Sequence, residues 1–391
     1  TWQDQGERRQ AQMNRNIGKK KSLLRNSGIQ TVIGSLLCIL LGLLVGFIVL
    51  LIINPGGAAE AVLAILKNFL YYPSAVAATK YFGTTLVKAS ALLMCSLSVL
   101  FAWKVGLFNI GAAGQYVIGA GACLYFGLAL KMPWYICLIA AVVAAGLVGA
   151  VSGFLKAYFN VNEVISCIML NWIGLYCVNM LLTRVKEQST PYTRTLKSAN
   201  QSGLLPTLGL DKLFSNNEFV TIGLILAVVI AVLVWILLEK TKLGYELKAT
   251  GFNKNAAKYC GMHEKRNIIL TMAIAGGLAG CGAGIFYLTG IEQWMVQQTS
   301  VPAMGFNGIA AAFLGGSHPI GAIFSSYFIQ HITSGGTYVD TTMYSSQISD
   351  LISAFIIYLC GFVLFFKVWL NKLLDRREEK LAGKGQKGGE A

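Results

Sequence analysis

The sequence predicts an all-α polytopic membrane protein with about ten transmembrane helices, some of them short or broken. Of its 391 residues, 55% are hydrophobic and only 13% are charged. A soluble protein carries about twice that charged fraction. Apolar runs of about 20 residues recur along the chain, and each is long enough to cross a hydrocarbon layer about 30 Å thick as a helix. These two observations exclude an ordinary soluble fold.

The chain divides into three predicted regions. Residues 1–30 form a basic tail, residues 31–370 form the transmembrane domain, and residues 371–391 form a second basic tail. The first span covers Thr31–Ile53, and a lysine cluster at 19–21 precedes it. Because basic residues flank spans on the cytoplasmic side, both tails are expected in the cytoplasm.

Seven further full-length spans are expected, and two shorter apolar pieces follow the same pattern. The full-length spans are 84–103, 108–130, 134–156, 162–182, 219–239, 267–289 and 348–370. The pieces 303–316 and 319–333 are too short to cross alone, and the helix breakers of GGSHPIG separate them. Counting both gives about ten crossings. The basic loop 240–266 then lies in the cytoplasm, while 54–83 and 184–218 face outward.

Three stretches place amide side chains inside these apolar segments: VGLFNIGAAGQYVIGAG, NVNEVISCIMLNWIG and VPAMGFNGIAAAFLGGSHPIG. An unpaired amide in hydrocarbon costs several kcal/mol, so these side chains must face protein or water. Two roles remain open for each of them, a hydrogen bond that ties helices together and a place on a hydrated pathway. Taken as a set, with glycines beside the first and third stretches, they favour a pathway. The amides are Asn109, Gln115, Asn162, Asn171 and Asn307.

Charged residues near the ends of spans are less informative. Glu163 begins a span, where the helix dipole favours a carboxylate, so a capping role competes with a pathway role. Lys88 and Lys104 lie near predicted span ends and are expected to extend toward the membrane surface.

The polar segment 242–267 is expected to contain a short surface helix at 253–260. Asn253 is a favoured residue for capping its start, and Gly261 for ending it. A small apolar face on this helix would suit a soluble partner that docks from the cytoplasm. The face comprises Ala256, Ala257 and Tyr259.

Several other functions find no support in the residues. The nine cysteines contain no C-x-x-C pair and the three histidines are scattered, so neither a metal site nor a disulfide framework is expected. The excess of basic residues lies mainly in tails and loops, which indicates topology rather than nucleic-acid binding. No phosphate-binding motif of the G-x-x-x-x-G-K-[ST] type occurs. An energy source for uphill transport would therefore belong to another subunit.

Four motifs carry a family resemblance: GLFNIGAAGQ, NEVISCIMLNWI, ATGFNKNAAKYCGM and GFNGIAAAFLG. Over about residues 30–370, the chain resembles the inner-membrane permease subunits of bacterial ABC importers of the branched-chain amino acid and ribose type. The NEVIS…MLNW stretch is most similar to the nucleoside and simple-sugar permeases. The resemblance implies a permease, not an enzyme, that moves such solutes into the cell.

The resemblance also implies partners. It places a coupling helix on a cytoplasmic ATP-binding cassette subunit, which holds the ATP, so that this chain needs no cofactor. The other partners that the resemblance implies are a second homologous permease, an extracellular solute-binding lipoprotein and the surrounding membrane lipid. Lys254 and Cys260 depart from the family pattern in this helix. The expected coupling residues are Gly251, Asn253, Ala256, Ala257, Tyr259 and Gly261.

In this interpretation, the amides line a route for a solute rich in hydroxyl groups, and two neighbouring aromatic rings stack on its flat face. The expected pathway residues are Phe108, Asn109, Gln115, Asn162, Glu163, Asn171, Phe306 and Asn307. An ion-coupled secondary transporter of a small polar solute is the alternative. That mechanism needs carboxylates inside the membrane, and the sequence offers only Glu163 and Asp350 near span ends.

Overall fold

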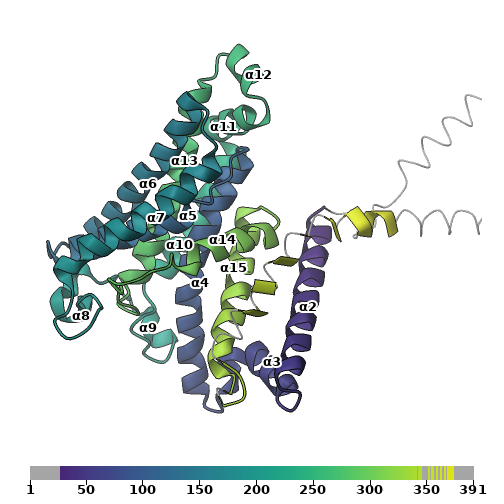
Figure 1. Cartoon of the computed structure of the whole chain (residues 1–391), viewed down its shortest axis with the longest axis vertical. Coiled ribbons are helices and arrows are strands. Elements are labelled where there is room, and N and C mark those ends of the chain that lie inside the picture. The colour runs from purple at the N-terminus through teal and green to yellow at the C-terminus, as the bar shows by residue number, and fades with distance from the viewer. Residues whose placement is uncertain are drawn as a thin grey trace, which may run out of the picture.

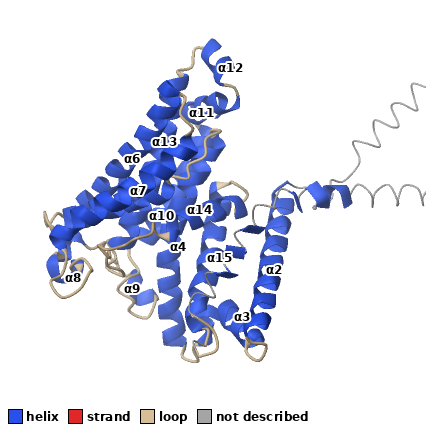
Figure 2. Cartoon of the chain, in the orientation of Figure 1, coloured by secondary structure: helices blue, strands red, loops and turns tan. Residues whose placement is uncertain are grey.

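The computed structural model describes residues 27–340 and 342–345 together with separate stretches between 351 and 373. Long helices dominate these residues and lie side by side as a bundle (Figures 1 and 2), which confirms the predicted all-α membrane fold. Helices α11 and α12 lie at one end of the bundle, and α3, α8 and α9 lie at the other (Figure 1). Most of both predicted tails lies outside the described residues.

Six helices among the described residues are long and apolar enough to cross a membrane. They are α2 (Ser27–Ile53), α4 (Ala75–Lys104), α6 (Trp134–Phe159), α7 (Glu163–Leu182), α10 (Gly223–Lys240) and α13 (Glu264–Tyr287). Three shorter helices complete the bundle and include the two predicted partial spans. They are α5 (Ala112–Leu128), α14 (Ala303–Leu314) and α15 (Pro319–Gly335). Much of the last predicted span, 348–370, falls outside the described residues.

The remaining elements are short and connect the spans. Near one end of the bundle they are α11 (Lys242–Phe252) and α12 (Lys254–Tyr259). The others are α3 (Ala58–Lys67), η2 (Asn68–Tyr71), η3 (Thr183–Val185), α8 (Leu196–Ala199), η4 (Gln201–Gly203), α9 (Leu210–Leu213) and η5 (Gly336–Tyr338).

Two helices form the centre of the bundle. The most apolar windows of α4 and α13 are 89% and 78% buried, whereas those of α2, α6, α7 and α10 are 28–33% buried. The four outer helices therefore present much of their apolar surface to their surroundings, as helices in contact with lipid do. The central pair carries small residues because its neighbours approach closely on every side.

Glycines allow the closest of these approaches. The Cβ of an alanine at Gly276 would lie directly against the carbonyl oxygen of Ala145 on α6, and one at Gly280 against that of Ala141. A Cβ at Gly149 on α6 would in turn meet the carbonyl oxygen of Met272. Burying apolar surface stabilises helix contacts little in lipid, so close backbone packing of this kind holds membrane helices together.

The neighbouring glycines of α13 provide a matched test of this packing. Gly276→Ala should lower the free energy of unfolding by about 1–3 kcal/mol, because the new methyl group forces α13 away from α6. Gly277→Ala should have much less effect, since the nearest atom to its Cβ would be a Val142 side-chain carbon at 3.3 Å. The thermal unfolding midpoints of both purified variants in detergent measure the difference. Equal midpoints would show that the α6–α13 contact is not tight.

Candidate functional site

A cavity of about 450 Å³ with both polar and apolar walls lies between α4, α5, α13, α14 and α15. Its volume lies in the range of about 300–1,000 Å³ that is usual for small-molecule sites. Polar side chains on several elements line it, together with three aromatic rings. The polar groups are Lys88, Glu292, Asn307, Gln330 and Thr333, the rings are Tyr116, Phe286 and Tyr287, and the remaining walls are Pro302, Ala303, Met304 and Ala354.

The first turn of α14 opens onto this cavity, since Pro302, Ala303 and Met304 all line it. The first N–H groups of a helix have no partner within the helix and carry a partial positive charge. Two glycines allow α14 to begin inside the bundle: a Cβ at Gly305 would meet Ala113 of α5, and one at Gly308 would lie 2.8 Å from Cys95 of α4. Partial helices that begin at a central site are typical of transporters.

The aromatic wall is a packed cluster. The ring centroids of Tyr116 and Tyr287 are 6.2 Å apart, and those of Phe286 and Tyr287 are 5.3 Å apart in an edge-to-face arrangement. Trp294 lies behind them, with its ring centroid 5.9 Å from that of Tyr287. All four side chains are buried, so the wall is rigid and presents an apolar surface beside the polar groups.

The segment 288–302 between α13 and α14 is held at several points. Trp294 accepts a hydrogen bond from the Thr193 N–H (2.9 Å) and donates its own N–H to the Thr193 hydroxyl (3.2 Å). Its indole Nε1–H donates to Asn179 Oδ1 of α7 (2.9 Å). These bonds fix the segment against its neighbours and so position Glu292, two residues before Trp294, at the cavity.

Sequence reasoning missed most of the polar lining. Lys88 was expected near the end of a span that begins at 84, but α4 begins at Ala75, which leaves Lys88 about 20 Å along the helix. It lines the cavity from there. An ionisable residue inside an apolar helix is rare and marks a functional site, so Lys88 carried a usable signal. Glu292 lies in the segment that follows α13, and Gln330 lies on a face of α15 that the sequence pattern does not define.

Three of the expected pathway amides form hydrogen bonds within the protein. Asn109 is fully buried, and its Nδ2 donates to Ser98 Oγ (3.0 Å) and to Gln115 Oε1 (2.8 Å). Gln115 Nε2 donates in return to Asn109 Oδ1 (3.1 Å). Asn171 of α7 accepts the Gly114 N–H (2.9 Å). None of the three lines the cavity described above, so the geometry favours the helix-tying role for them.

The next two expected residues lie at the start of α7. Asn162 caps this helix, since its Oδ1 accepts the Val164 N–H (2.9 Å). Glu163 forms an ion pair with Lys156 of α6 (2.8 Å). Both side chains therefore fix the turn between α6 and α7, Asn162 as the helix cap and Glu163 through its ion pair.

The expected aromatic residues also lie away from the cavity, whereas one amide lines it. Phe108 packs edge-to-face on Trp103, with ring centroids 6.3 Å apart. Phe306 is 39% exposed and does not line the cavity. Asn307, the next residue, is half-buried and lines it directly. Of the eight expected pathway residues, Asn307 alone belongs to this cavity.

The predicted surface helix exists as α12, and its predicted cap is confirmed. Asn253 Oδ1 accepts the Ala256 N–H (3.0 Å), and Gly261 follows the helix with a φ of +79°. Gly251, at the end of α11, contacts the turn between α4 and α5. The Cβ of an alanine there would meet the carbonyl oxygen of Val105 and, at 3.0 Å, the backbone nitrogen of Gly106.

The exposed face of this region differs from the expected one. Ala256 and Tyr259 are exposed, but Ala257 is only 4% exposed, because successive residues of a helix point about 100° apart and Ala257 faces inward. Phe252, which the sequence analysis left out, is 97% exposed, and Tyr259 is 92% exposed. The exposed face therefore keeps Ala256 and Tyr259 of the predicted set, loses Ala257 and gains the ring of Phe252.

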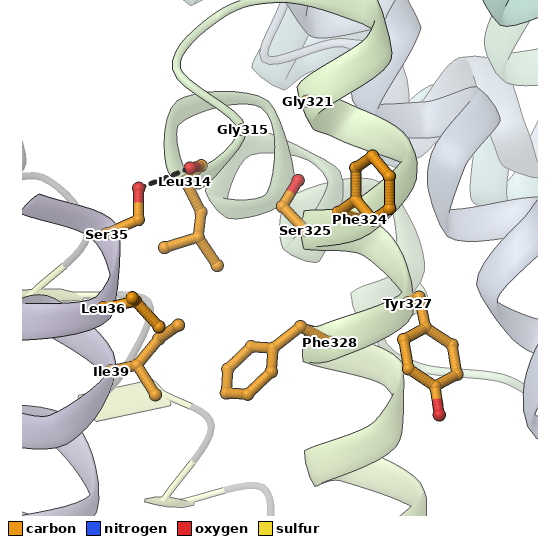
Figure 3. Close-up of a pocket in the computed structure, with 10 residues that line it drawn as sticks. All are labelled: Ser35, Leu36, Ile39, Leu314, Gly315, Gly321, Phe324, Ser325, Tyr327 and Phe328. Carbon is orange, nitrogen blue, oxygen red and sulfur yellow. Dashed lines mark hydrogen bonds between the residues drawn. The ribbon is translucent and has the colours of Figure 1, made fainter. Parts of the chain in front are cut away.

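A second pocket, of about 430 Å³, lies between α2 and the α14–α15 hairpin (Figure 3). Its walls are mainly apolar, and its hydroxyl groups already have partners. Ser35 donates to the Leu314 carbonyl oxygen (2.7 Å), Ser325 donates to that of Ala311 (2.5 Å), and the Tyr327 hydroxyl contacts His331 Nδ1 (3.4 Å). This pocket therefore offers little to a polar solute.

A glycine-packed bundle with partial helices around a partly polar cavity defines a membrane transport protein. The profile of the family described as "Branched-chain amino acid transport system / permease component" matches residues 81–361, and the chain belongs to this family. It is thus a multi-pass permease component of the cell membrane and not an enzyme.

Named relatives agree with this family. The nucleoside ABC transporter permease protein NupB of Lactococcus lactis is 32% identical over 93% of this chain and 100% of its own length. The guanosine ABC transporter permease protein NupP of Bacillus subtilis is 32% identical over 82% of this chain and 90% of its own. The glucose ABC transporter permease protein TsgB13 of Haloferax volcanii is 28% identical over 76% and 81%. No solved structure shows a significant match.

Asn109, which is buried, and Asn307, which lines the cavity, allow the two roles of the amides to be tested against each other. Asn109→Leu should lower thermal stability, by about 0.6–1.7 kcal/mol for each bond lost, because it leaves Gln115 unpaired in the core. Asn307→Leu should leave the stability of the purified protein nearly unchanged, since this side chain faces the cavity. Thermal unfolding of both variants measures the contrast. A larger loss for Asn307→Leu would reverse the two assignments.

Proposed function

We propose that the chain is a transmembrane permease subunit of an ABC importer that carries nucleosides or simple sugars into a bacterial cell. The observation that carries the proposal is the cavity between α4, α5, α13, α14 and α15, in which amide and charged groups stand beside an aromatic wall. The relatives are named as transporters of nucleosides, guanosine and glucose, which supports the same class of solute.

The chemistry of such a solute fits the lining. Ribose and sugar hydroxyls both donate and accept hydrogen bonds, as do the amides of Asn307 and Gln330. A flat base or the apolar face of a sugar packs against aromatic rings such as Tyr287. The free N–H groups at the start of α14 add donors. Together these groups replace the water that a polar solute loses inside the membrane.

The proposed orientation places α11 and α12 in the cytoplasm. The segment between α10 and α13 is rich in lysine, and the positive-inside rule assigns such short loops to that side. The opposite end, with α3, α8 and α9, then faces outward and receives solute from an extracellular binding protein. The second permease is proposed on the family resemblance, and the two permeases would enclose the route together.

The exposed rings of Phe252 and Tyr259 are proposed to dock on the cytoplasmic ATPase, which binds and hydrolyses ATP. Large aromatic side chains that insert into a partner's pocket commonly dominate the energy of an interface. The backbone contact of Gly251 with Val105 and Gly106 connects this docking region to the end of α4, the helix that carries Lys88.

The solute route can be tested at Asn307. In the assembled transporter, Asn307→Leu should lower nucleoside uptake at least tenfold, because it removes a polar partner of the solute while complex assembly and ATP hydrolysis continue. Uptake of radiolabelled nucleoside into proteoliposomes, together with ATP hydrolysis, measures the effect. The control is Gln201→Leu, which changes an exposed amide outside the cavity. Normal uptake by Asn307→Leu would remove this cavity from the proposed route.

The docking site can be tested at the two exposed rings. Phe252→Ser combined with Tyr259→Ser should abolish co-purification of the ATPase subunit and, with it, solute uptake. The thermal stability of the permease should not change. Leu208→Ser is the control, since Leu208 is 71% exposed in the segment between α8 and α10. Unchanged ATPase binding by the double variant would place the docking surface elsewhere.

A further inference from the structure

The cavity holds two full charges of opposite sign. Lys88 approaches it from α4, and Glu292 approaches it from the anchored segment 288–302. Of the described residues that line the cavity, these two are the only ones that carry a charge near neutral pH. Lys88 is half-buried and Glu292 is exposed.

The two charged groups face the same cavity but do not form an ion pair with each other. Among the described residues, no carboxylate oxygen lies within 4.0 Å of the Lys88 ammonium, the limit for an ion pair. Desolvation by the surrounding protein raises the pKa of the Glu292 carboxyl, and the positive charge of Lys88 opposes that shift. The cation and the anion therefore line the same cavity from different elements, with more than 4.0 Å between the ammonium nitrogen and the carboxylate oxygens.

This arrangement has an energetic reason. A charge inside a membrane protein is costly unless an opposite charge balances it. Removing one member of such a pair leaves an uncompensated charge and is strongly unfavourable, whereas replacing both members by neutral groups is often harmless. Neither Lys88 nor Glu292 takes part in the ion pairs that other described residues form.

We propose that Lys88 and Glu292 are counter-ions across the solute cavity and that their balance selects an uncharged solute with both donor and acceptor groups. The inference rests on the proposed function, because it assigns the specificity of that same cavity. An ammonium donates to a hydroxyl or carbonyl oxygen, and a carboxylate accepts from a hydroxyl or N–H group. A nucleoside or sugar offers both kinds of group, whereas a solute with a net charge is attracted by one wall and repelled by the other and so gains no advantage over a neutral one.

The test is a double-mutant cycle in the complete transporter, with its ATPase, partner permease and binding protein in proteoliposomes. The variants are Lys88→Met, Glu292→Gln and their combination, and a charge-reversed pair, Lys88→Glu with Glu292→Lys, is added. The matched controls are Lys80→Met, an exposed lysine of α4 outside the cavity, and Glu187→Gln, an exposed glutamate. Nucleoside uptake, ATP hydrolysis and their ratio are measured for each.

Each single variant should lower the number of nucleosides taken up per ATP hydrolysed at least tenfold. The neutral pair should recover to within about threefold of the wild type, and the charge-reversed pair should recover at least partly. Both controls should match the wild type. Because a folding defect lowers uptake and ATP hydrolysis together, the ratio separates an effect on the route from loss of protein.

Other outcomes overturn the inference. Single variants with normal ratios would show that neither charge matters to the route. A neutral pair whose loss is the product of the two single losses would show two independent solute contacts, not counter-ions. In both cases the wild type still takes up nucleoside, so the proposed function stands. A wild-type transporter that hydrolyses ATP but takes up no nucleoside or sugar would contradict the proposed function itself.

Discussion

Close backbone contact between helices is the constraint on which the rest of this structure depends. In lipid, helices gain little from burying apolar side chains, so their association depends on how near their backbones approach. Glycines on α13 and α6 allow that approach, and the same device brings α14 against α4 and α5. Only because α14 lies this deep in the bundle can its first turn open onto an internal cavity.

The polar groups of the bundle divide into two sets with opposite roles. Asn109, Gln115 and Asn171 form hydrogen bonds within the protein and connect the α4–α5 turn to α4 and α7. Lys88, Glu292 and the other cavity groups lie on different elements around an open space. The first set makes the region rigid, and the second can engage a solute because the first holds its walls in place.

Much of this organisation could be predicted from the sequence. Apolar runs gave the spans, the breakers near Pro319 separated two partial helices, and Asn253 marked the start of α12. The direction in which each amide points could not be predicted, because helices that are apolar on all sides have no periodicity that reveals the inner face. Lys88 was misjudged because α4 extends further than its most apolar stretch.

The exposed face of α12 was in part wrongly predicted, for a related reason. A helix such as α12, with six residues, makes fewer than two turns, so a small error in its rotation exchanges the buried face for the exposed one. Ala257 and Tyr259 were assigned to one face, yet one is buried and the other exposed. Side-chain size does not settle the rotation either, since Ala256 is exposed and Ala257 is buried.

The contact of Gly251 with Val105 and Gly106 has a mechanical consequence. Side chains between two elements act as soft spacers, since they change rotamer and absorb part of any displacement. Here backbone meets backbone, and Gly106 has a φ of +74° that further restricts which residues the site accepts. Two backbone segments in contact cannot move closer together, because no side chain between them can change its rotamer. A displacement of the end of α11 toward the α4–α5 turn would therefore move that turn with little loss.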